Sequence, residues 1–156
     1  MNNKQKSEIN YFFVHVFNQI LSWEEHSFKE MGFSDLSLRE LHVIEAVCNL
    51  KETKRNRMSS IAGYLSITPG SLTTAVNTLV KKGYLERETV PDDRRVVLIV
   101  PTDKAVLVNE THTKFHSEMI DAVGKLTNEK EIEVLVETLG KLSRFFENKS
   151  NIGGRK

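Results

Sequence analysis

Several features are missing from this 156-residue sequence, and each absence excludes a class of protein. The chain has one cysteine, Cys48, which excludes an intramolecular disulfide framework and fits a reducing compartment. No apolar run is long enough for a signal-peptide core or a membrane span, so we expect a cytoplasmic protein without a membrane partner. The sequence also lacks a Gly-rich phosphate loop, a nucleophile motif and carboxylates clustered at a spacing that indicates catalysis. We therefore predict that the protein is not an enzyme and needs no cofactor.

Acidic residues are absent from one long segment. No Asp or Glu occurs from Thr53 to Leu85, whereas Lys or Arg occupies five of these positions. Residues 51–95 contain nine basic and five acidic side chains, although the whole chain has a net charge of only +1. A basic block in a near-neutral chain indicates one surface that faces an anionic partner.

The two ends of the chain have helical patterning. Apolar residues from Ile9 to Trp23 recur at helical spacing in a wide, aromatic stripe, and Gly32 is expected to end that helix. Ser37 and Glu40 form a capping-box pattern at the start of the next helix. Two long helices are expected in the C-terminal part, with the N-caps Thr102 and Thr127.

The middle of the chain predicts two short helices and a hairpin. The first helix covers about residues 57–65, with Asn56 as its candidate cap. The second begins with Thr68 as N-cap and Pro69 at the first helical position, and Gly83 ends it. Two β-rich segments then flank the turn sequence PDDR, which predicts a hairpin.

The second short helix separates two kinds of surface. At 100° per residue, its apolar side chains cluster around Leu72 and can pack on a core. The opposite side collects small hydroxyl and amide side chains and ends in Lys81. Such short side chains let a helix enter the DNA major groove, where Asn77 can bond adenine bidentately and a Thr methyl can contact the thymine methyl. The helix N-terminus adds free N–H groups that favour anions.

The order of these elements predicts a winged helix-turn-helix. The two short helices form the helix-turn-helix, and Arg94 and Arg95 lie near the tip of the hairpin, within reach of a minor groove. For an isolated helix, a Thr- and Ser-rich face is usually only solvated. Here, however, four features coincide. They are a segment without acidic residues, the turn residues of a helix-turn-helix, a hairpin with arginines near its tip, and long apolar helices at both ends of the chain. The fold class is therefore mainly α with a small β-hairpin wing.

The sequence resembles the MarR family of dimeric bacterial transcriptional regulators over nearly its whole length. The segments that carry the resemblance are SSIAGYLSITPGSLTTAVNTLVKKGYLERE and DDRRVVLIVPT. The resemblance implies a homodimer that binds double-stranded operator DNA. It places the family's Asp-x-Arg wing motif on Asp93 and Arg95, with Arg95 entering the minor groove and Asp93 orienting basic side chains.

Within the family, LSLRELHVIEAV, GSLTTAVNTL and HTKFH resemble repressors of fatty-acid biosynthesis. That likeness implies a corepressor in the form of acyl carrier protein with a long acyl chain. We predict one MarR-like domain over 1–156, with a winged helix-turn-helix lobe at 37–102 and dimerisation helices at 7–31 and 103–148. The predicted DNA-binding residues are Ser71, Thr73, Thr74, Asn77, Lys81, Asp93, Arg94 and Arg95.

The resemblance also implies an effector cavity between the dimerisation helices and the DNA-binding lobes. The side chains that would line it are mostly apolar, with two histidines near a mouth, which suits an acyl chain or a hydrophobic aromatic better than a sugar. Core packing is the alternative for each of these residues. The predicted lining residues are Phe13, Phe17, Ile20, Leu41, His42, Phe115, His116 and Met119.

Other candidate sites have weaker support. His112 and His116 lie at i, i+4, a spacing that can hold Zn²⁺, and Glu118 or His15 are the further ligands considered. We predict polar pocket lining or solvent exposure for this pair, and no metal. Cys48 is expected to be a buried, inert thiol rather than a peroxide sensor. The open alternatives are a repressor that answers to a small aromatic or metal effector, a helical metal-dependent enzyme and a protein-interaction module.

Overall fold

The computed structural model describes residues 1–53, 56–90 and 93–153, without the side chains of Glu52, Arg94, Arg95 and residues 150–153. Part of the acid-free segment, Lys54 and Arg55, and part of the predicted turn, Pro91 and Asp92, lie outside the described residues. The chain forms two compact units, Met1–His112 and Thr113–Lys156, and each is considered by itself. None of the described helices is both long enough and apolar enough to cross a membrane.

The N-terminal helix begins earlier than predicted and is interrupted. Asn2 accepts a hydrogen bond from the backbone N–H of Gln5 at 2.9 Å, and the Gln5 side chain accepts one from Asn2, so the helix begins at Asn3 instead of residue 7. A π-helical segment then changes the phase of the apolar stripe. Gly32 has φ +93°, as expected of a helix-ending glycine. The elements are α1 (Asn3–Tyr11), η1 (Phe12–Val16) and α2 (Phe17–Glu30).

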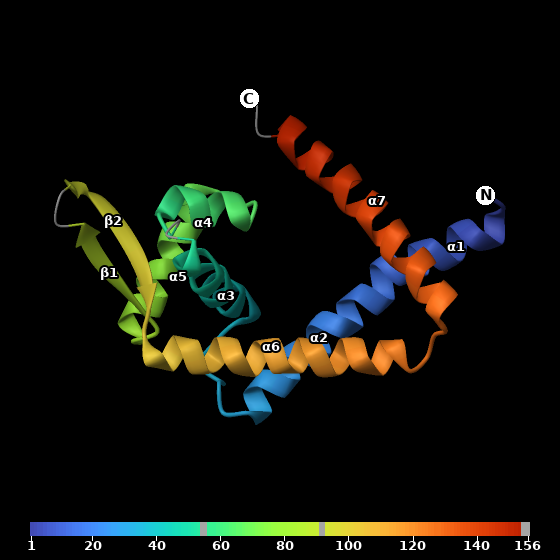
Figure 1. Ribbon diagram of the computed structural model, residues 1–156, viewed down its shortest axis with the longest axis horizontal. Helices are drawn as coiled ribbons and strands as arrows, with labels where there is room; N and C mark the ends of the chain where they lie inside the picture. Colours follow the sequence, from blue (N-terminus) through green and yellow to red (C-terminus); the bar gives the residue numbers. More distant parts are fainter. Residues whose placement is uncertain (54–55, 91–92, 154–156) are drawn as a thin grey trace. The chain divides into compact units, whose positions relative to one another are not determined.

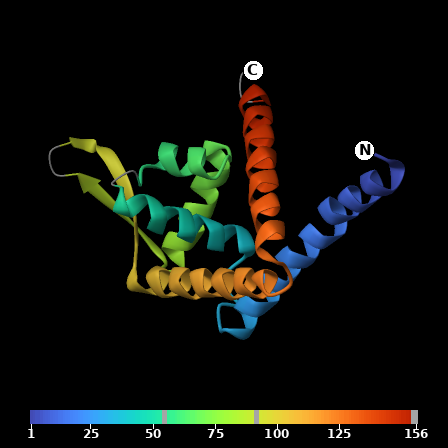
Figure 2. The ribbon, with the colours of Figure 1, turned by 45° about the vertical axis from the view of Figure 1, so that its right-hand side comes forward.

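Three helices and a hairpin form the next part of the first unit (Figures 1 and 2). The predicted capping box is confirmed, since Ser37 and Glu40 cap each other's backbone N–H groups. Thr68 is the N-cap of the second short helix, with Pro69 at its first position, and Gly83 after its end has φ +76°. The elements are α3 (Leu38–Glu52), α4 (Met58–Tyr64), α5 (Pro69–Lys81), β1 (Leu85–Val90) and β2 (Asp93–Pro101).

Asn56 does not cap α4, so that prediction is wrong. Arg57 occupies the N-cap position without a side-chain cap, while the buried Asn56 amide donates to the carbonyl of Ile99 at 2.8 Å. The backbone N–H of Ile99 donates in turn to Asn56, and Arg57 forms a β-bridge with Leu98. The segment before α4 therefore pairs with β2, which satisfies more backbone groups than a cap would.

The predicted hairpin is confirmed. β1 and β2 pair antiparallel from Leu85 opposite Pro101 to Thr89 opposite Val97, with an irregularity after Thr89. Behind the hairpin, the three helices share one core with fully buried side chains. Its largest apolar members are Tyr84, Leu41, Ile44, Ile61, Leu72, Leu79, Leu85 and Ile99.

Two long helices complete the chain, α6 (Asp103–Gly124) and α7 (Glu129–Gly153). Thr102 caps α6 as predicted, with its hydroxyl oxygen 3.4 Å from the N–H of Ala105. Thr127 does not cap α7, because its hydroxyl donates to the last carbonyls of α6. Asn128 accepts from the N–H of Glu131 instead, and the Glu131 carboxylate accepts from Asn128. Thr127 therefore satisfies carbonyl groups at the C-terminal end of α6 and leaves the capping of α7 to Asn128.

Candidate nucleic-acid interface

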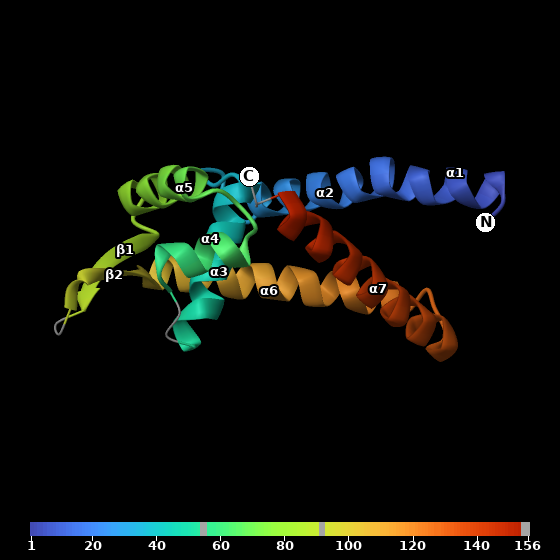
Figure 3. The ribbon, with the colours of Figure 1, turned by 90° about the horizontal axis from the view of Figure 1, so that it is seen from above.

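Helix α5 has the two surfaces that its sequence predicts. Its core-facing side chains Leu72, Val76 and Leu79 have no exposed surface. The opposite face is open to solvent, and Figure 3 shows α5 along the edge of the lobe with the hairpin beside it. Ser71 is half-buried, whereas the other predicted α5 contacts are exposed: Thr73, Thr74, Asn77 and Lys81.

Hydroxyl groups on α5 are held against the helix backbone. Thr73 donates to the carbonyl of Pro69 at 2.8 Å, and Thr74 donates to that of Gly70 at 3.2 Å. These bonds hold the two threonine side chains in fixed rotamers on the exposed side of the helix. No Asp or Glu lies on α5, so nothing on the helix itself repels a phosphate. The face can therefore approach the base edges of a duplex closely.

The C-terminal end of α5 is fastened to the loop before α3. The Lys82 ammonium donates to both carboxylate oxygens of Glu40 at 2.9 Å and to the backbone carbonyl of Asp35. Burial raises the pKa of Glu40, but hydrogen bonds from Ser37 and Lys82 outweigh burial and leave the pKa lowered. The Tyr84 hydroxyl donates to the Asp35 carboxylate at 2.8 Å. These contacts, which we call the Lys82 clamp, set the position of α5 relative to α3.

The wing residues are only partly described. Asp93 is exposed at the start of β2, whereas the side chains of Arg94 and Arg95 lie outside the described residues. Their assignment to DNA contacts stays a prediction. A residue that sequence reasoning did not select, Arg87 of β1, donates from its guanidinium to the Asn77 carboxamide oxygen at 2.6 Å. Through Arg87, the hairpin thus contacts the exposed face of α5, the face opposite its buried side chains.

An apolar pocket of about 510 Å³ lies between α2, α3 and the end of α4. This volume is within the usual range of small-molecule sites. The pocket contains two of the predicted effector residues, Phe17 and His42, and adds the cationic side chain of Arg39. Its full lining is Phe17, Leu21, Leu38, Arg39, His42, Val43, Leu65 and Ile67.

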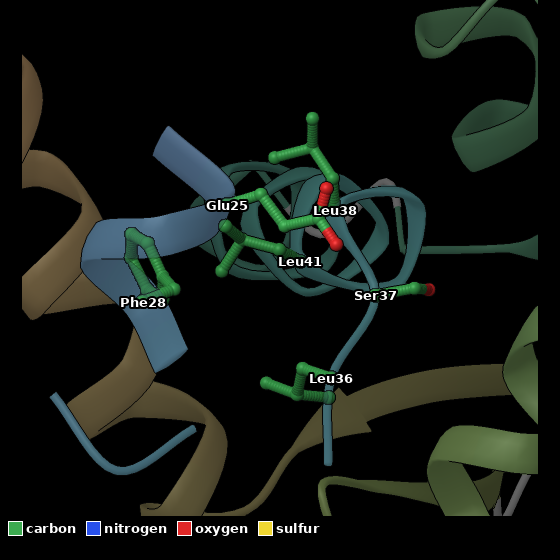
Figure 4. A pocket seen from close by; sticks show the side chains of 6 residues that line it. All are labelled: Glu25, Phe28, Leu36, Ser37, Leu38 and Leu41. Atoms are coloured by element: carbon green, nitrogen blue, oxygen red, sulfur yellow. The ribbon is translucent and has the colours of Figure 1, made fainter. Parts of the chain in front are cut away.

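The other predicted effector residues are placed elsewhere. Phe13 is exposed and Ile20 half-buried, and neither lines the pocket. Leu41 lines a gap on α2 and the start of α3 with room for about one water molecule, at about 10 Å³ (Figure 4). The last three belong to the second unit, in which Phe115 is buried and contacts the ring of His116 while Met119 is half-buried.

A buried charged cluster links α2, α3 and α6. The Glu24 carboxylate, 2% exposed, lies 2.6 Å from His112 Nε2 and 3.4 Å from His42 Nε2. His112 is itself 1% exposed, and its Nδ1 lies 3.7 Å from the Glu45 carboxylate. His112 was expected to line a pocket or face solvent, and that expectation is wrong, because the ring is needed to satisfy a buried carboxylate.

The cluster perturbs the ionisation of its members. Burial raises the pKa of Glu24, but hydrogen bonds and charges from His112 and His42 outweigh burial and lower the pKa to about 2. The hydrogen bond and charge of Glu24 raise the pKa of His42 against the effect of burial. Because His42 also lines the 510 Å³ pocket, it connects that pocket to the buried Glu24–His112 pair.

Glu24, His42 and His112 are also spaced as metal ligands, with all ligand atoms within 4.8 Å of one another. The predicted partner His116 is not in this group, nor are Glu118 and His15. Glu24 could have been noticed in the sequence, because it lies four residues after Ile20 and four before Phe28, on the apolar face of its helix. A carboxylate in such a stripe requires buried partners.

Cys48 is half-buried instead of fully buried as expected. Its position is about 100° around α3 from Val47, which has no exposed surface, so Cys48 lies at the margin of the core-facing side. The thiol is therefore partly accessible to solvent.

Comparisons with known proteins agree with this geometry. The MarR family model matches residues 36–97. The structure of Streptococcus pneumoniae FabT in complex with DNA has a TM-score of 0.82 and 32% sequence identity, covering 92% of this chain and 98% of FabT. The MepR–DNA complex of S. aureus, at 17% identity and a TM-score of 0.73, shares the fold and covers 88% of this chain and 97% of MepR.

A curated relative is the Bacillus subtilis (strain 168) protein YcgE, an uncharacterized HTH-type transcriptional regulator. It is 33% identical over 82 residues, which span 52% of this chain and 53% of YcgE. The chain thus matches about half the length of that relative, while it covers nearly all of FabT. The chain therefore belongs to the MarR family, whose members are DNA-binding transcriptional regulators and not enzymes.

Proposed function

We propose that this protein is a sequence-specific repressor that inserts α5 into the DNA major groove. The observation that carries the proposal is the contrast across α5, where Leu72, Val76 and Leu79 are fully buried and the opposite, acid-free face is exposed. The proposed contacts are those of the sequence: Ser71, Thr73, Thr74, Asn77, Lys81, Asp93, Arg94 and Arg95. A regulator of this kind acts in the cytoplasm, where the chromosome is accessible.

The repressor acts as a homodimer in this proposal. Residues 37–102 are the DNA-binding lobe, and helices within 7–31 and 103–148 hold two copies together. Support comes from apolar side chains that one chain leaves open, such as Phe17, 52% exposed, and Leu139, 50% exposed. Two copies of α5 then enter successive major grooves about one helical turn apart.

Selection of bound sequences from a random duplex library tests the proposal. The expected result is a palindromic consensus whose half-sites are about 10 base pairs apart, bound with an affinity that falls steeply with salt. Genome-wide capture of bound DNA then names the regulated genes. Recovery of no enriched sequence, with salt-independent binding, would reject the DNA-binding role and favour a protein-interaction module.

For the effector, we propose a long acyl chain delivered on acyl carrier protein, acting as corepressor. The apolar lining of the 510 Å³ pocket suits an acyl chain, and Arg39 and His42 at the same pocket suit an anionic group attached to it. The fatty-acid subgroup that the sequence resembles favours the same ligand. If the acylated carrier binds the DNA-competent dimer preferentially, DNA must tighten carrier binding by the same factor.

The corepressor proposal is tested by measuring operator affinity under three conditions. These are with long-chain acyl carrier protein, with a short-chain form and without carrier. The expected order is tightest binding with the long chain, and Leu21→Asp should abolish the difference because it places a charge in the pocket. Lys4→Asp on α1, an exposed position outside the proposed dimerisation helices, is the control substitution. Equal affinity in all three conditions would reject the corepressor and leave DNA binding intact.

A divalent metal is the second candidate effector, and the Glu24–His42–His112 group favours it. A carboxylate and two imidazoles are ligands that Zn²⁺ prefers, and Glu45 near His112 Nδ1 could orient that ring. The metal effector is tested by dialysing the wild type and His42→Ala against Zn²⁺ and then measuring the metal content of each protein. One retained equivalent that the variant lacks would support a metal effector, and equal content in both would exclude this site.

A further inference from the structure

Arg87 and Asn77 form a pair that joins the wing to the recognition helix. The Arg87 Nη2 group donates to Asn77 Oδ1 at 2.6 Å, a short distance for such a bond. Both side chains are exposed, and both belong to the first compact unit. The bond therefore lies at the surface where α5 is proposed to meet DNA.

The strand explains why Arg87 points toward α5. Alternate residues of a strand lie on the same face, so Arg87 shares a face with Leu85, which is 1% exposed. Its cross-strand neighbour is Ile99, which is completely buried. The backbone thus directs Arg87 toward the helical core, and its long side chain carries the guanidinium out to Asn77 on α5.

This bond changes what Asn77 can offer to a base. Bidentate binding of adenine requires the Asn oxygen to accept from the N6 amino group while the Asn amino group donates to N7. In the structure the Asn77 oxygen already accepts from Arg87. What the pair presents is then mainly donors, the Asn77 amino group and the remaining guanidinium N–H groups, beside one remaining lone pair of the Asn77 oxygen.

A donor-rich pair complements guanine. The major-groove edge of guanine has two acceptors, N7 and O6, and arginine is the side chain that most often contacts both. Among the described residues, no carboxylate lies within ion-pair distance of the Arg87 guanidinium. Its positive charge is therefore available to the duplex.

We propose that Arg87 is a specificity-determining residue and that the Arg87–Asn77 pair recognises a guanine in each operator half-site. The proposal deepens the proposed function and rests on it, since it needs α5 in the major groove. It replaces the adenine contact that the sequence of α5 alone predicts for Asn77. It also gives β1 a part in base recognition.

The experiment first selects a consensus duplex with the wild-type protein. Affinities are then measured for that duplex, for guanine-to-adenine changes at each position, and for 7-deazaguanine, which lacks the N7 acceptor. The proteins compared are the wild type, Arg87→Ala, Arg87→Lys, Asn77→Ala, the double alanine variant and Lys4→Ala. Lys4 is an exposed lysine of α1 outside the proposed dimerisation and DNA-binding segments, so its removal controls for the loss of one positive charge.

The expected result is one guanine per half-site whose replacement by adenine or 7-deazaguanine costs the wild type about tenfold in affinity. Arg87→Ala and Asn77→Ala should each remove most of that discrimination, and the double variant should lose little more, because the two side chains act together. Arg87→Lys should retain affinity better than specificity, since lysine lacks the planar fork. Lys4→Ala should behave as the wild type.

Two results would overturn the proposal. If Arg87→Ala weakened binding to all duplexes equally and kept the guanine preference, Arg87 would contact phosphate only. If Arg87→Ala bound every duplex as the wild type does, Arg87 would have no part in recognition. Failure of the wild type to select any sequence would instead overturn the proposed function, and circular dichroism confirms that each variant is folded.

Discussion

The DNA-binding lobe and helix α7 differ in where their apolar side chains lie. In the lobe, Val43, Ile61 and Leu72 have no exposed surface. In α7, Leu135 is 39% exposed and Leu139 is 50% exposed, although the two lie four residues apart on one apolar face of the helix. The lobe therefore completes its core within one chain, whereas α7 presents an apolar face of the kind that marks an interface. The difference supports the proposal that one chain forms the DNA-binding surface and that two chains assemble through α7.

Removal of α7 should have the largest effect on the protein. A chain that ends at Thr127 should lose the dimer and aggregate, because the apolar surfaces that α7 covers in the assembly would face water. Size-exclusion chromatography with light scattering and circular dichroism measure this. Leu139→Asp should weaken the dimer, and Glu137→Asp on the same helix should not. A well-folded monomer from the truncated chain would refute the assignment.

The buried cluster in the first unit gives the next largest effect. Glu24→Gln should reduce the free energy of unfolding by about 3 kcal/mol, because it leaves His112 buried without its carboxylate. Glu25→Gln, at an exposed neighbour, should leave the free energy of unfolding nearly unchanged. Urea denaturation near pH 6 compares the two variants, and equal stability would show that the cluster adds nothing.

The same cluster predicts a pH dependence. The pKa of Glu24 falls from 4.5 to about 2 on folding, so its contribution is complete above about pH 4.5 and is lost as the pH falls through about 2. The pKa of His42 is raised, so its contribution is complete below about 6.5 and is lost as the pH rises through the folded value. The difference between wild type and Glu24→Gln should therefore shrink from pH 6 to pH 2.5. A constant difference would contradict the assignment.

Local sequence signals predicted much of the fold, and long-range contacts account for what they did not predict. Ser37, Glu40, Thr68 and Pro69 act within one helical turn, so their roles follow from their spacing. Asn56 was misassigned because it pairs with Ile99, 43 residues away. Spacing along the chain carries no information about such contacts.

The residues of the candidate site also fall into two groups, those that local patterns predict and those that depend on long-range contacts. The exposed face of α5 follows from helical periodicity, so Thr74 and Asn77 were predicted correctly as exposed. Glu24 was not predicted because its partner His112 is 88 residues away. Arg87 was not predicted because its contact with Asn77 depends on how the hairpin packs against α5. The pocket residues that follow α4, Leu65 and Ile67, depend on packing as well.

The Lys82 clamp provides a smaller test of the lobe. Lys82→Met should reduce the free energy of unfolding by about 1–3 kcal/mol, because Glu40 loses two charge-assisted hydrogen bonds. Lys81→Met, at the exposed neighbouring position, should leave stability unchanged and weaken DNA binding. Thermal denaturation and duplex affinity are measured on both variants. If both variants had the same stability, the clamp would not position α5.

The wing gives the smallest expected effect. Arg95→Ala should weaken binding to all duplexes and reduce the slope of log affinity against log salt by about one, as expected for one lost phosphate contact. Affinity titrations at several salt concentrations measure the slope. An unchanged slope would remove Arg95 from the DNA interface.

The central claim is that the exposed face of α5 recognises a base sequence. The most direct measurement is the affinity of the wild type and of Thr74→Ala for the selected operator and for a shuffled duplex of the same composition. We predict that the wild type prefers the operator and that Thr74→Ala lowers operator affinity by about 1–3 kcal/mol and relaxes the preference. Affinity and preference that are the same in both proteins would contradict the claim.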